Sequence, residues 1–343
     1  MGRVRLLLVG LGNLGRRFCE ILADKGAGLR AQYGLDFVVV GAADSRGAAY
    51  APEGLELGEM IRLKLDGRSI AEYPVVGRTG WDARDLVRSA DADALLEASP
   101  VNLPLGAEPG LTCIRSALAR GMNVVTPNKG PLVVAFRELH ALAAEHGVQL
   151  RYDGTVAGGL PAVYIGTRDL RGADVAAIEA VPNLVTGDIM DLLTDGVGWE
   201  EALSRARAEG VLEADASWDL DGWDAAAKLA ILANAVLGLS VGLDDIARIG
   251  IGALTPGDLS AARQYGLRYR LLAQARREAG GQYALSVAPV ALGPEHPLGR
   301  LGRKQMGVVY TTDIYGTLTC IIDEPTPVPS SATMLRDLLD IYA

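Results

Sequence analysis

The chain has 343 residues, of which 49% are hydrophobic and 22% charged, and its formal net charge is -9. This length predicts two domains of about 150 residues each. The negative charge excludes nucleic acid as a partner, because phosphate binding needs clustered Lys and Arg. No apolar run reaches the roughly 18 residues of a membrane span, and the first one is too short for a secretory signal. We therefore expect a cytoplasmic protein with no membrane partner.

The cysteines and histidines are too few and too scattered to predict a metal centre. Cys19, Cys113 and Cys320 lie in apolar stretches at unrelated spacings, which indicates neither a disulfide framework nor a zinc site. His140 and His146 form the nearest histidine pair, and their spacing does not suit two ligands on one helical face. Catalysis by histidine is not expected.

A glycine-rich turn follows the first predicted strand, residues 3–9. It reads G-L-G-N-L-G and leads into the helical pattern R-R-F-C-E-I-L-A. Three glycines at this spacing permit a tight turn, close approach of a pyrophosphate and close helix packing, with the phosphates at the helix N-terminus. The turn predicts a dinucleotide site with contacts from Gly10, Gly12, Asn13, Leu14 and Gly15.

The second predicted strand, F-V-V-V-G-A-A, ends at Asp44. A carboxylate at this position would accept hydrogen bonds from the ribose 2'-hydroxyl and repel a 2'-phosphate, which favours NAD. Ser45 and Arg46 follow directly, however, and Arg62 and Lys64 could fold back to supply positive charge. Both NAD and NADP therefore remain open as cofactors.

Strands and helices alternate through the rest of the first half, with strands expected at 94–99, 123–126 and 148–152 and helices near 82–90, 108–120 and 134–146. Such alternation predicts an α/β fold of the Rossmann type, with a doubly wound parallel sheet and right-handed crossovers. Ligands of these folds gather at the carboxyl ends of strands. We expect further cofactor contacts at two strand ends, from Ser99, Pro100, Asn128 and Lys129.

Lys129 is the candidate proton carrier of the first half. It follows Asn128 in a loop between Pro127 and Pro131, and we expect it to project towards the cofactor crevice. The alternative is a surface lysine in a turn.

The second half predicts an α+β catalytic and dimerisation domain. We expect a strand at 175–181, helices at 200–208 and 225–237, a pair of antiparallel strands, two further strands, and a last helix that returns to the nucleotide domain. The expected domains are 1–131, 132–310 and the returning segment 311–343. The apolar strands have no obvious covering elements, so a homodimer formed through this sheet is expected.

An acidic stretch precedes the helix expected at 225–237. It reads E-A-D-A-S-W-D-L-D-G-W-D-A-A-A-K from Glu213 to Lys228. Asp224 and Lys228 are four residues apart and share one helical face. A capped surface helix with a solvated Asp–Lys pair is one interpretation. The apolar run L-A-I-L-A that follows favours a partly buried lysine instead, whose pKa can fall towards the range useful for proton transfer.

Three motifs in order, N-K-G, D-G-T-V-A-G-G-L-P and E-A-D-x3-D-L-D-G-W-D-A-A-A-K-L, make the chain resemble the homoserine dehydrogenase family, in particular its compact, archaeal-type members. The resemblance implies NAD(P)-dependent interconversion of L-aspartate 4-semialdehyde and L-homoserine, a small amino-acid substrate. It implies that Lys129 and Lys228 act on the reacting oxygen and that Glu213 holds the substrate amino group. It also implies that Asp219 assists substrate binding and that Asp224 orients Lys228.

The segment from Tyr152 to Pro161 resembles the family loop that binds a structural monovalent cation through backbone carbonyls and one acidic side chain. By this resemblance Asp153, Val156 and Gly158 are candidate ligands for sodium. Asp153 stands where the family commonly has Glu, so its side chain is one methylene shorter.

Two segments depart from the family pattern on the substrate and nicotinamide side. In N-L-V-T-G-D-I-M, Val185 replaces a threonine expected to contact substrate, and the loop Asp323–Ser331 replaces a glycine-rich segment. Loss of a hydroxyl changes which ligand fits more than whether a hydride moves. A related dehydrogenase for another small hydroxy or oxo acid, or a nucleotide-binding homologue without turnover, are the alternatives to a homoserine dehydrogenase.

Overall fold

The computed structural model describes residues 2–208 and 216–343. Its contacts divide the chain into two compact units: unit 1 is Met1–Thr155 with Thr326–Ala343, and unit 2 is Val156–Pro325. The expected boundary at residue 131 falls instead inside α5 (Lys129–Glu145). That helix packs on α4 and β7 of the first sheet, so unit 1 continues beyond it.

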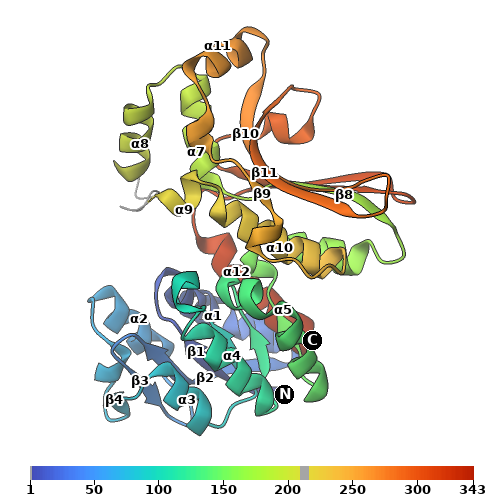
Figure 1. The fold of residues 1–343 in the computed structure, drawn as a ribbon. Helices are drawn as coiled ribbons and strands as arrows, with labels where there is room; N and C mark the ends of the chain where they lie inside the picture. The colour runs from blue at the N-terminus through green and yellow to red at the C-terminus, as the bar shows by residue number, and fades with distance from the viewer. Residues whose placement is uncertain (1, 209–215) are drawn as a thin grey trace. The chain divides into compact units, whose positions relative to one another are not determined.

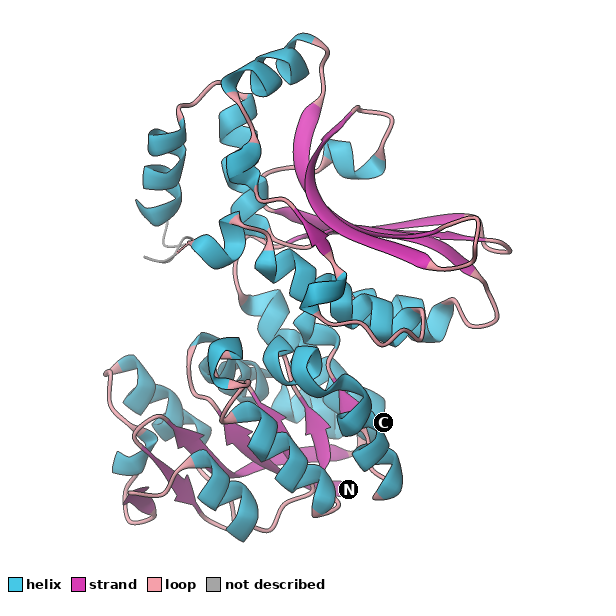
Figure 2. Cartoon of the chain, viewed as in Figure 1, coloured by secondary structure: helices cyan, strands magenta, loops and turns pink. Residues whose placement is uncertain are grey.

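Unit 1 is the Rossmann-type α/β domain that the sequence predicted (Figures 1 and 2). Its seven-stranded sheet has the order β4-β3-β2-β1-β5-β6-β7, in which β2, β1, β5, β6 and β7 are parallel. The strands are β1 (Gly2–Val9), β2 (Leu35–Asp44), β3 (Gly47–Tyr50), β4 (Gly77–Thr79), β5 (Ala94–Glu97), β6 (Asn123–Val125) and β7 (Leu150–Arg151). The antiparallel edge strands β3 and β4 were not predicted from the sequence.

The buried strands of this sheet have near-continuous apolar sequences because helices cover both faces. Leu6, Leu7 and Leu8 of β1 are each fully buried. The helices are α1 (Asn13–Tyr33), α2 (Leu57–Leu65), α3 (Ala83–Ser89), α4 (Gly110–Ala119), α5 and α12 (Val328–Tyr342), with short turns η1 (Ile70–Glu72), η2 (Leu103–Leu105) and η3 (Asp153–Thr155). The strands and helices expected between residues 82 and 152 are thereby confirmed. Most of them are shorter than expected, whereas α5 begins at Lys129 instead of near residue 134.

The last helix returns to the nucleotide domain, as expected. Met334 and Leu338 of α12 are buried in the same core as Phe18 of α1. Tyr342 lies edge-on to Phe37 of β2, with 6.3 Å between ring centroids. The C-terminal helix is therefore part of the wall of unit 1.

Unit 2 contains a six-stranded sheet of order β13-β12-β8-β10-β11-β9, with all neighbours antiparallel except β11 and β9. Its long strands curve strongly (Figure 2). The strands are β8 (Val175–Val181), β9 (Ala247–Arg248), β10 (Arg268–Arg277), β11 (Tyr283–Leu292), β12 (Gln305–Thr312) and β13 (Thr317–Asp323). The strand at 175–181 and the antiparallel strands are confirmed.

Helices α7 and α10 of unit 2 pack against β10. The described helices of the unit are α6 (Ala162–Tyr164), α7 (Leu184–Thr194), α8 (Trp199–Ala208), α9 (Ser217–Leu220), α10 (Trp223–Val236) and α11 (Pro256–Gln264), with the short turns η4 (Ile165–Asp169), η5 (Leu243–Asp245), η6 (Ile251–Ala253) and η7 (Pro297–Arg300). Alanine and leucine fill α10 from Ala225 to Ala233, and its buried face confirms the predicted apolar continuation of the acidic stretch.

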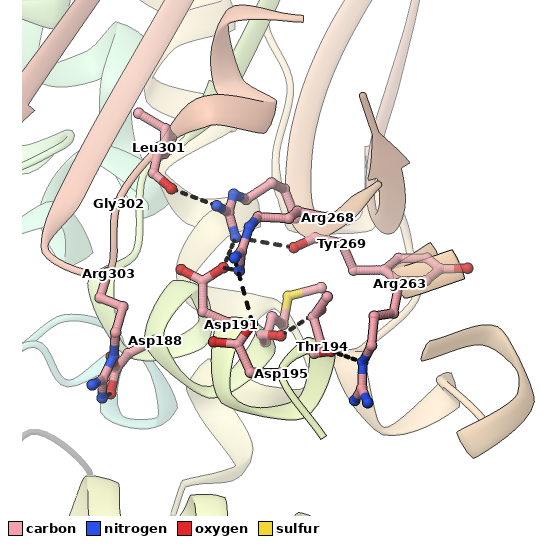
Figure 3. A network of polar contacts seen from close by, with 12 residues as sticks. Asp188, Asp191, Thr194, Asp195, Arg263, Arg268, Tyr269, Leu301, Gly302 and Arg303 are labelled. Carbon is pink, nitrogen blue, oxygen red and sulfur yellow. Dashed lines mark hydrogen bonds and ion pairs between the residues drawn. The ribbon is translucent and has the colours of Figure 1, made fainter. Parts of the chain in front are cut away.

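A buried ion-pair network fixes α7 to the sheet (Figure 3). Arg270 of β10 is 1% exposed and its Nη1 lies 2.7 Å from Oδ1 of Asp191 on α7. Arg270 also donates to the backbone carbonyls of Leu298 and Leu301. Arg268 adds a second contact to Asp191 at 2.9 Å. The position of α7 therefore depends on charges that the surrounding protein keeps from water.

We predict that Arg270→Met lowers the free energy of unfolding by about 3–5 kcal/mol, because it leaves Asp191 buried with one cation fewer and removes the Arg270 donor from the Leu301 carbonyl. Chemical denaturation measures this change. Arg276→Met on the same strand is the matched control, since Arg276 is exposed and 3.5 Å from Glu179. The control should change stability by about 1 kcal/mol or less. Equal losses in the two variants would contradict the structural role of the network.

Candidate active site

The glycine turn after β1 has the geometry of a dinucleotide-binding turn. Gly10 has φ +92°, and a Cβ there would lie 2.3 Å from the carbonyl oxygen of Ala98. A Cβ on Gly15 would lie 2.0 Å from the carbonyl oxygen of Gly10. Gly12 differs, because a Cβ there meets nothing within 4 Å among the described residues. Two glycines thus permit internal packing, and the third faces open space.

The N-terminus of α1 lies at that open position. Gly12 is its N-cap and provides no side-chain hydrogen bond, and Asn13 and Leu14 are its first two residues. The first N–H groups of a helix need acceptors from outside the helix. An anion supplies such acceptors and is stabilised by the helix dipole. The turn therefore fits the pyrophosphate of a dinucleotide.

Asp44, at the end of β2, is 8% exposed and already engaged by several donors. Its carboxylate accepts hydrogen bonds from Nζ of Lys64 at 2.7 Å, from Oγ of Ser69 at 2.8 Å and from the backbone N–H of Ile70 at 2.9 Å. It also accepts the N–H of Arg46. These contacts differ from the expected role, since the acceptor positions needed for ribose hydroxyls are occupied by protein.

The three cationic side chains that the sequence places near Asp44 have different hydrogen-bond partners. Lys64 folds back to the strand end, as the sequence analysis considered. Arg62 instead pairs with Glu59 and Asp66 on its own helix. Ser45 and Arg46 form the turn between β2 and β3, and the Arg46 guanidinium donates to the carbonyl of Gly67. The negative charge of Asp44 is thus balanced by one largely buried ammonium, that of Lys64.

The ends of β5 and β6 come together as expected. Asn128 caps α5, accepting the N–H of Gly130 at 3.0 Å, and its amide lies 3.4 Å from Oγ of Ser99. Pro100 is exposed beside Ser99, and half-buried Lys129 is the first residue of α5. Four predicted cofactor contacts therefore share one edge of the sheet.

On unit 2, the amide of Asn183 gathers the polar side chains of the substrate cluster, which we define as Asn183, Asp219, Asp224 and Lys228. Its Nδ2 donates to Oδ1 of Asp219 at 2.6 Å and to Oδ2 of Asp224 at 2.7 Å. Its Oδ1 accepts the N–H of Thr186 at 3.1 Å and so caps α7. One residue fixes two carboxylates from two other helices. The sequence analysis noted Asn183 but assigned it no role.

Lys228 completes the substrate cluster. Its Nζ lies 2.7 Å from Oδ2 of Asp224 and donates to the carbonyl of Pro182 at 2.7 Å. The side chains of Lys228 and Asp224 are 15% and 7% exposed, so the pair is largely buried rather than solvated. The one-face pairing predicted from the four-residue spacing is confirmed.

Two residues of the predicted site need separate mention. Glu213 lies outside the described residues. Val185 is the second residue of α7 and is half-buried, directly after the cap at Asn183.

One of the candidate cation ligands, Asp153, already has a partner within the chain. The Asp153 carboxylate is fully buried and paired with the guanidinium of Arg336 on α12. A carboxylate neutralised in this way is a poor partner for another cation. Val156 and Gly158 belong to unit 2, where the N–H of Gly159 donates to Oε2 of Glu324 at 2.9 Å. Glu324, from the altered C-terminal loop, was not anticipated at this place.

Among residues 2–208 and 216–343, no group of three or more His, Cys, Asp and Glu is arranged to hold a metal ion. Within the same ranges, none of the helices has the length and apolar character needed to cross a bilayer.

We predict a pH-dependent stability effect for Asp44→Asn. Burial alone would raise the pKa of Asp44, but hydrogen bonds from Lys64, Ile70, Arg46 and Ser69 outweigh burial and lower this pKa. The stabilisation is therefore present above the unfolded value near pH 4 and is lost as pH falls through the lower folded pKa. The variant should lose about 2 kcal/mol at pH 7, and the difference from wild type should shrink below about pH 4.

Denaturation at several pH values measures this difference. Asp66→Asn is the control, because Asp66 is half-exposed and pairs with Arg62 on the surface. A loss for Asp44→Asn that stays constant down to pH 3 would contradict the assignment.

Family models match both halves of the chain. The model described as "Homoserine dehydrogenase, NAD binding domain" matches residues 10–153, and the model described as "Homoserine dehydrogenase" matches residues 161–339. The chain is 30% identical to an NAD(+)-dependent homoserine dehydrogenase of Pseudomonas canavaninivorans, covering 100% of this chain and 97% of that protein. It is 31% identical to a homoserine dehydrogenase of Methanocaldococcus jannaschii, covering 98% of each.

Solved structures agree with these matches. A putative homoserine dehydrogenase from Archaeoglobus fulgidus superposes with a TM-score of 0.88 at 32% identity, covering 99% of each chain. A hyperthermophilic archaeal homoserine dehydrogenase in complex with NADPH has a TM-score of 0.86 at 24% identity, covering 99% of this chain and 98% of that one, a likeness of fold. With both units matched and full-length relatives at 30% identity or above, the chain belongs to the homoserine dehydrogenase family.

Proposed function

We propose that this protein is an NAD(P)-dependent dehydrogenase that interconverts L-homoserine and L-aspartate 4-semialdehyde. The observation that carries the proposal is the substrate cluster on unit 2, in which a largely buried lysine pairs with Asp224 and Asn183 holds that carboxylate in place. Family membership over the whole chain supports the reaction, and the glycine turn of unit 1 supports the cofactor class.

The chemistry assigned to Lys228 follows from its hydrogen-bonding capacity. An ammonium has three N–H donors, and the described partners of Lys228 are the Asp224 carboxylate and the Pro182 carbonyl. We assign the third donor to the substrate oxygen. During reduction of the aldehyde, negative charge develops on that oxygen, and a fixed cation stabilises the charge and then transfers a proton.

Asp224 orients Lys228 through their ion pair. Asp219, fixed by the same amide, is assigned to substrate binding together with Glu213. Lys129 is assigned as a second cation for the reacting oxygen, supported by its place at the start of α5 beside Asn128. When bound, the dinucleotide supplies the site that gives or accepts the hydride.

The residues assigned to hold NAD or NADP are those of the glycine turn and of the ends of β5 and β6. NAD is named for the Pseudomonas relative and NADPH for the archaeal structure, so the relatives support both cofactors. The buried pairing of Asp44 with Lys64 weakens the argument that Asp44 repels a 2'-phosphate, because the carboxylate charge is already balanced.

Absorbance at 340 nm, measured with purified protein and homoserine, tests the reaction with each cofactor in turn. Formation of NADH or NADPH from homoserine is the expected result. Turnover confined to another small hydroxy acid would instead favour the substrate change suggested by Val185. Cofactor binding without turnover on any hydroxy acid would indicate a nucleotide-binding homologue.

We predict that Lys228→Ala lowers kcat by about 10²- to 10⁴-fold while the dissociation constant of the cofactor stays within about twofold, because the proton donor is lost and the glycine turn is untouched. Steady-state kinetics and fluorescence titration with NADH measure the two quantities. Lys304→Ala, at an exposed lysine of unit 2, is the control and should retain activity. Wild-type turnover in Lys228→Ala would refute the proton path.

We also propose that activity does not depend on sodium, since Arg336 already balances the charge of Asp153. Replacing sodium and potassium by choline at constant ionic strength should leave the initial rate within about twofold, because the paired Asp153 carboxylate does not serve as a cation ligand. A rate that collapses in choline and recovers on adding sodium would contradict this assignment.

A homodimer built through the sheet of unit 2 is proposed as the assembly. Exposed apolar side chains on and beside this sheet support it, with Ile314 61%, Tyr315 54% and Ile321 46% exposed in the single chain. A cytoplasmic location is proposed as well, supported by the three free thiols at Cys19, Cys113 and Cys320.

A further inference from the structure

We propose that Glu97 is a positioning residue for the cofactor side of the active site. Its buried carboxylate would join the loop after β5 to the loop after β6 and thereby fix Ser99, Asn128 and the start of α5. The proposal rests on the proposed dehydrogenase function, but its central measurement is cofactor binding, which does not require turnover.

Glu97 is the last residue of β5 and is 0% exposed. Its Oε1 accepts the backbone N–H of Ser99 at 2.9 Å and also the hydroxyl of Ser99. The same carboxylate therefore bonds twice to the residue that opens the loop after β5. This loop leaves the sheet at the edge where Ser99 and Pro100 are assigned to the cofactor.

The second loop is attached to the same carboxylate. Oε2 of Glu97 lies 3.2 Å from the hydroxyl of Thr126. Thr126 in turn accepts the backbone N–H of Asn128 at 3.0 Å. Because Asn128 caps α5, the chain of contacts from Glu97 ends at the helix whose first residue is Lys129.

Packing leaves the carboxylate little freedom to move. A Cβ on Gly110, at the start of α4, would lie 2.9 Å from Nδ2 of Asn128 and 3.1 Å from the carboxyl carbon of Glu97. Only glycine permits α4 to approach this closely. The helix therefore closes the space on one side of the network.

Donors converge on the carboxyl group of Glu97. The N–H and the hydroxyl of Ser99 donate to Oε1, and the Thr126 hydroxyl lies 3.2 Å from Oε2 and 2.9 Å from the backbone carbonyl of Glu97. Burial raises the pKa of Glu97, so an acid at this position costs folding free energy. The preceding strand residues, Leu95 and Leu96, are fully buried leucines. A costly buried acid that ends such a strand is typical of functional sites.

The test compares Glu97→Gln with Asp93→Asn. The glutamine keeps the shape but turns an NH2 group towards donors. Asp93 is the matched control because it is a partly buried carboxylate before the opposite end of β5, bonded to the backbone N–H of Arg5 at 2.7 Å. Both variants lose a hydrogen-bonded carboxylate of the same strand region, but only Glu97 faces the loops assigned to the cofactor.

We expect the dissociation constants of NADH and NADPH, measured by fluorescence titration without substrate, to rise about tenfold or more in Glu97→Gln. They should stay within about twofold of wild type in Asp93→Asn. In steady-state assays the KM for cofactor should rise and kcat should fall in Glu97→Gln. The KM for homoserine should be nearly unchanged, because the substrate cluster lies on unit 2. Thermal unfolding verifies that each variant is folded.

Cofactor dissociation constants equal to wild type in folded Glu97→Gln would overturn the proposal, as would equal weakening in both variants. If Glu97→Gln does not fold, Thr126→Val replaces it, since valine preserves the shape and removes the hydroxyl between Glu97 and Asn128. It should weaken NADH binding, and unchanged binding would again overturn the proposal. A wild-type protein that binds NADH but does not oxidise homoserine would refute the proposed function and leave this test intact.

Discussion

The contact on which the substrate side depends is the amide of Asn183, which bonds to two carboxylates at once. Two buried acids close together repel each other unless donors and a cation compensate. Asn183 supplies one N–H to each acid, and Lys228 supplies the positive charge. Because Asn183 also caps α7, the anchoring of that helix by Arg270 and Asp191 determines where the acids and the lysine stand. The buried network in Figure 3 therefore helps to fix the position in which Lys228 acts.

Unit 1 also contains buried carboxylates that need compensating donors, at the ends of its parallel strands. Asp44 and Glu97 are buried carboxylates that close β2 and β5, and each is surrounded by donors from the chain itself. Asp44 is neutralised by Lys64, whereas Glu97 is held by neutral donors from two loops. The first arrangement stabilises a turn at the adenosine end expected for this fold. The second organises the loops that lead to Lys129. The buried carboxylates at the ends of these two apolar strands thus lie at the edge of the sheet where the cofactor is expected.

Helices and strands whose apolar residues recur at a regular spacing were predictable from the sequence. Contacts between residues far apart in the chain were not. The apolar residues of the strand at 175–181 and of the helix that begins at Trp223 follow patterns that can be read from adjacent residues of the chain alone. The four-residue spacing of Asp224 and Lys228 likewise predicted their pairing. The return of Lys64 to Asp44 was considered from the sequence, but the contacts of Asp44 with Ser69 and Ile70 were not foreseen, because the short turn η1 has no strong sequence signal. Glu97 lies inside the strand expected at 94–99 and was assigned no role, although a lone acid there was the available signal. The pairing of Asp153 with Arg336 joins residues far apart in the chain, which spacing cannot indicate.

The proposed reaction depends most on Lys228, paired with Asp224, serving the reacting oxygen. The most direct measurement is a crystal structure of the enzyme with homoserine and an oxidised nicotinamide cofactor bound. The account predicts that Nζ of Lys228 lies within hydrogen-bonding distance, about 3 Å, of the substrate hydroxyl while its contact with Asp224 persists. A substrate hydroxyl bound away from Lys228, with the lysine still bonded only to Asp224 and Pro182, would contradict the claim.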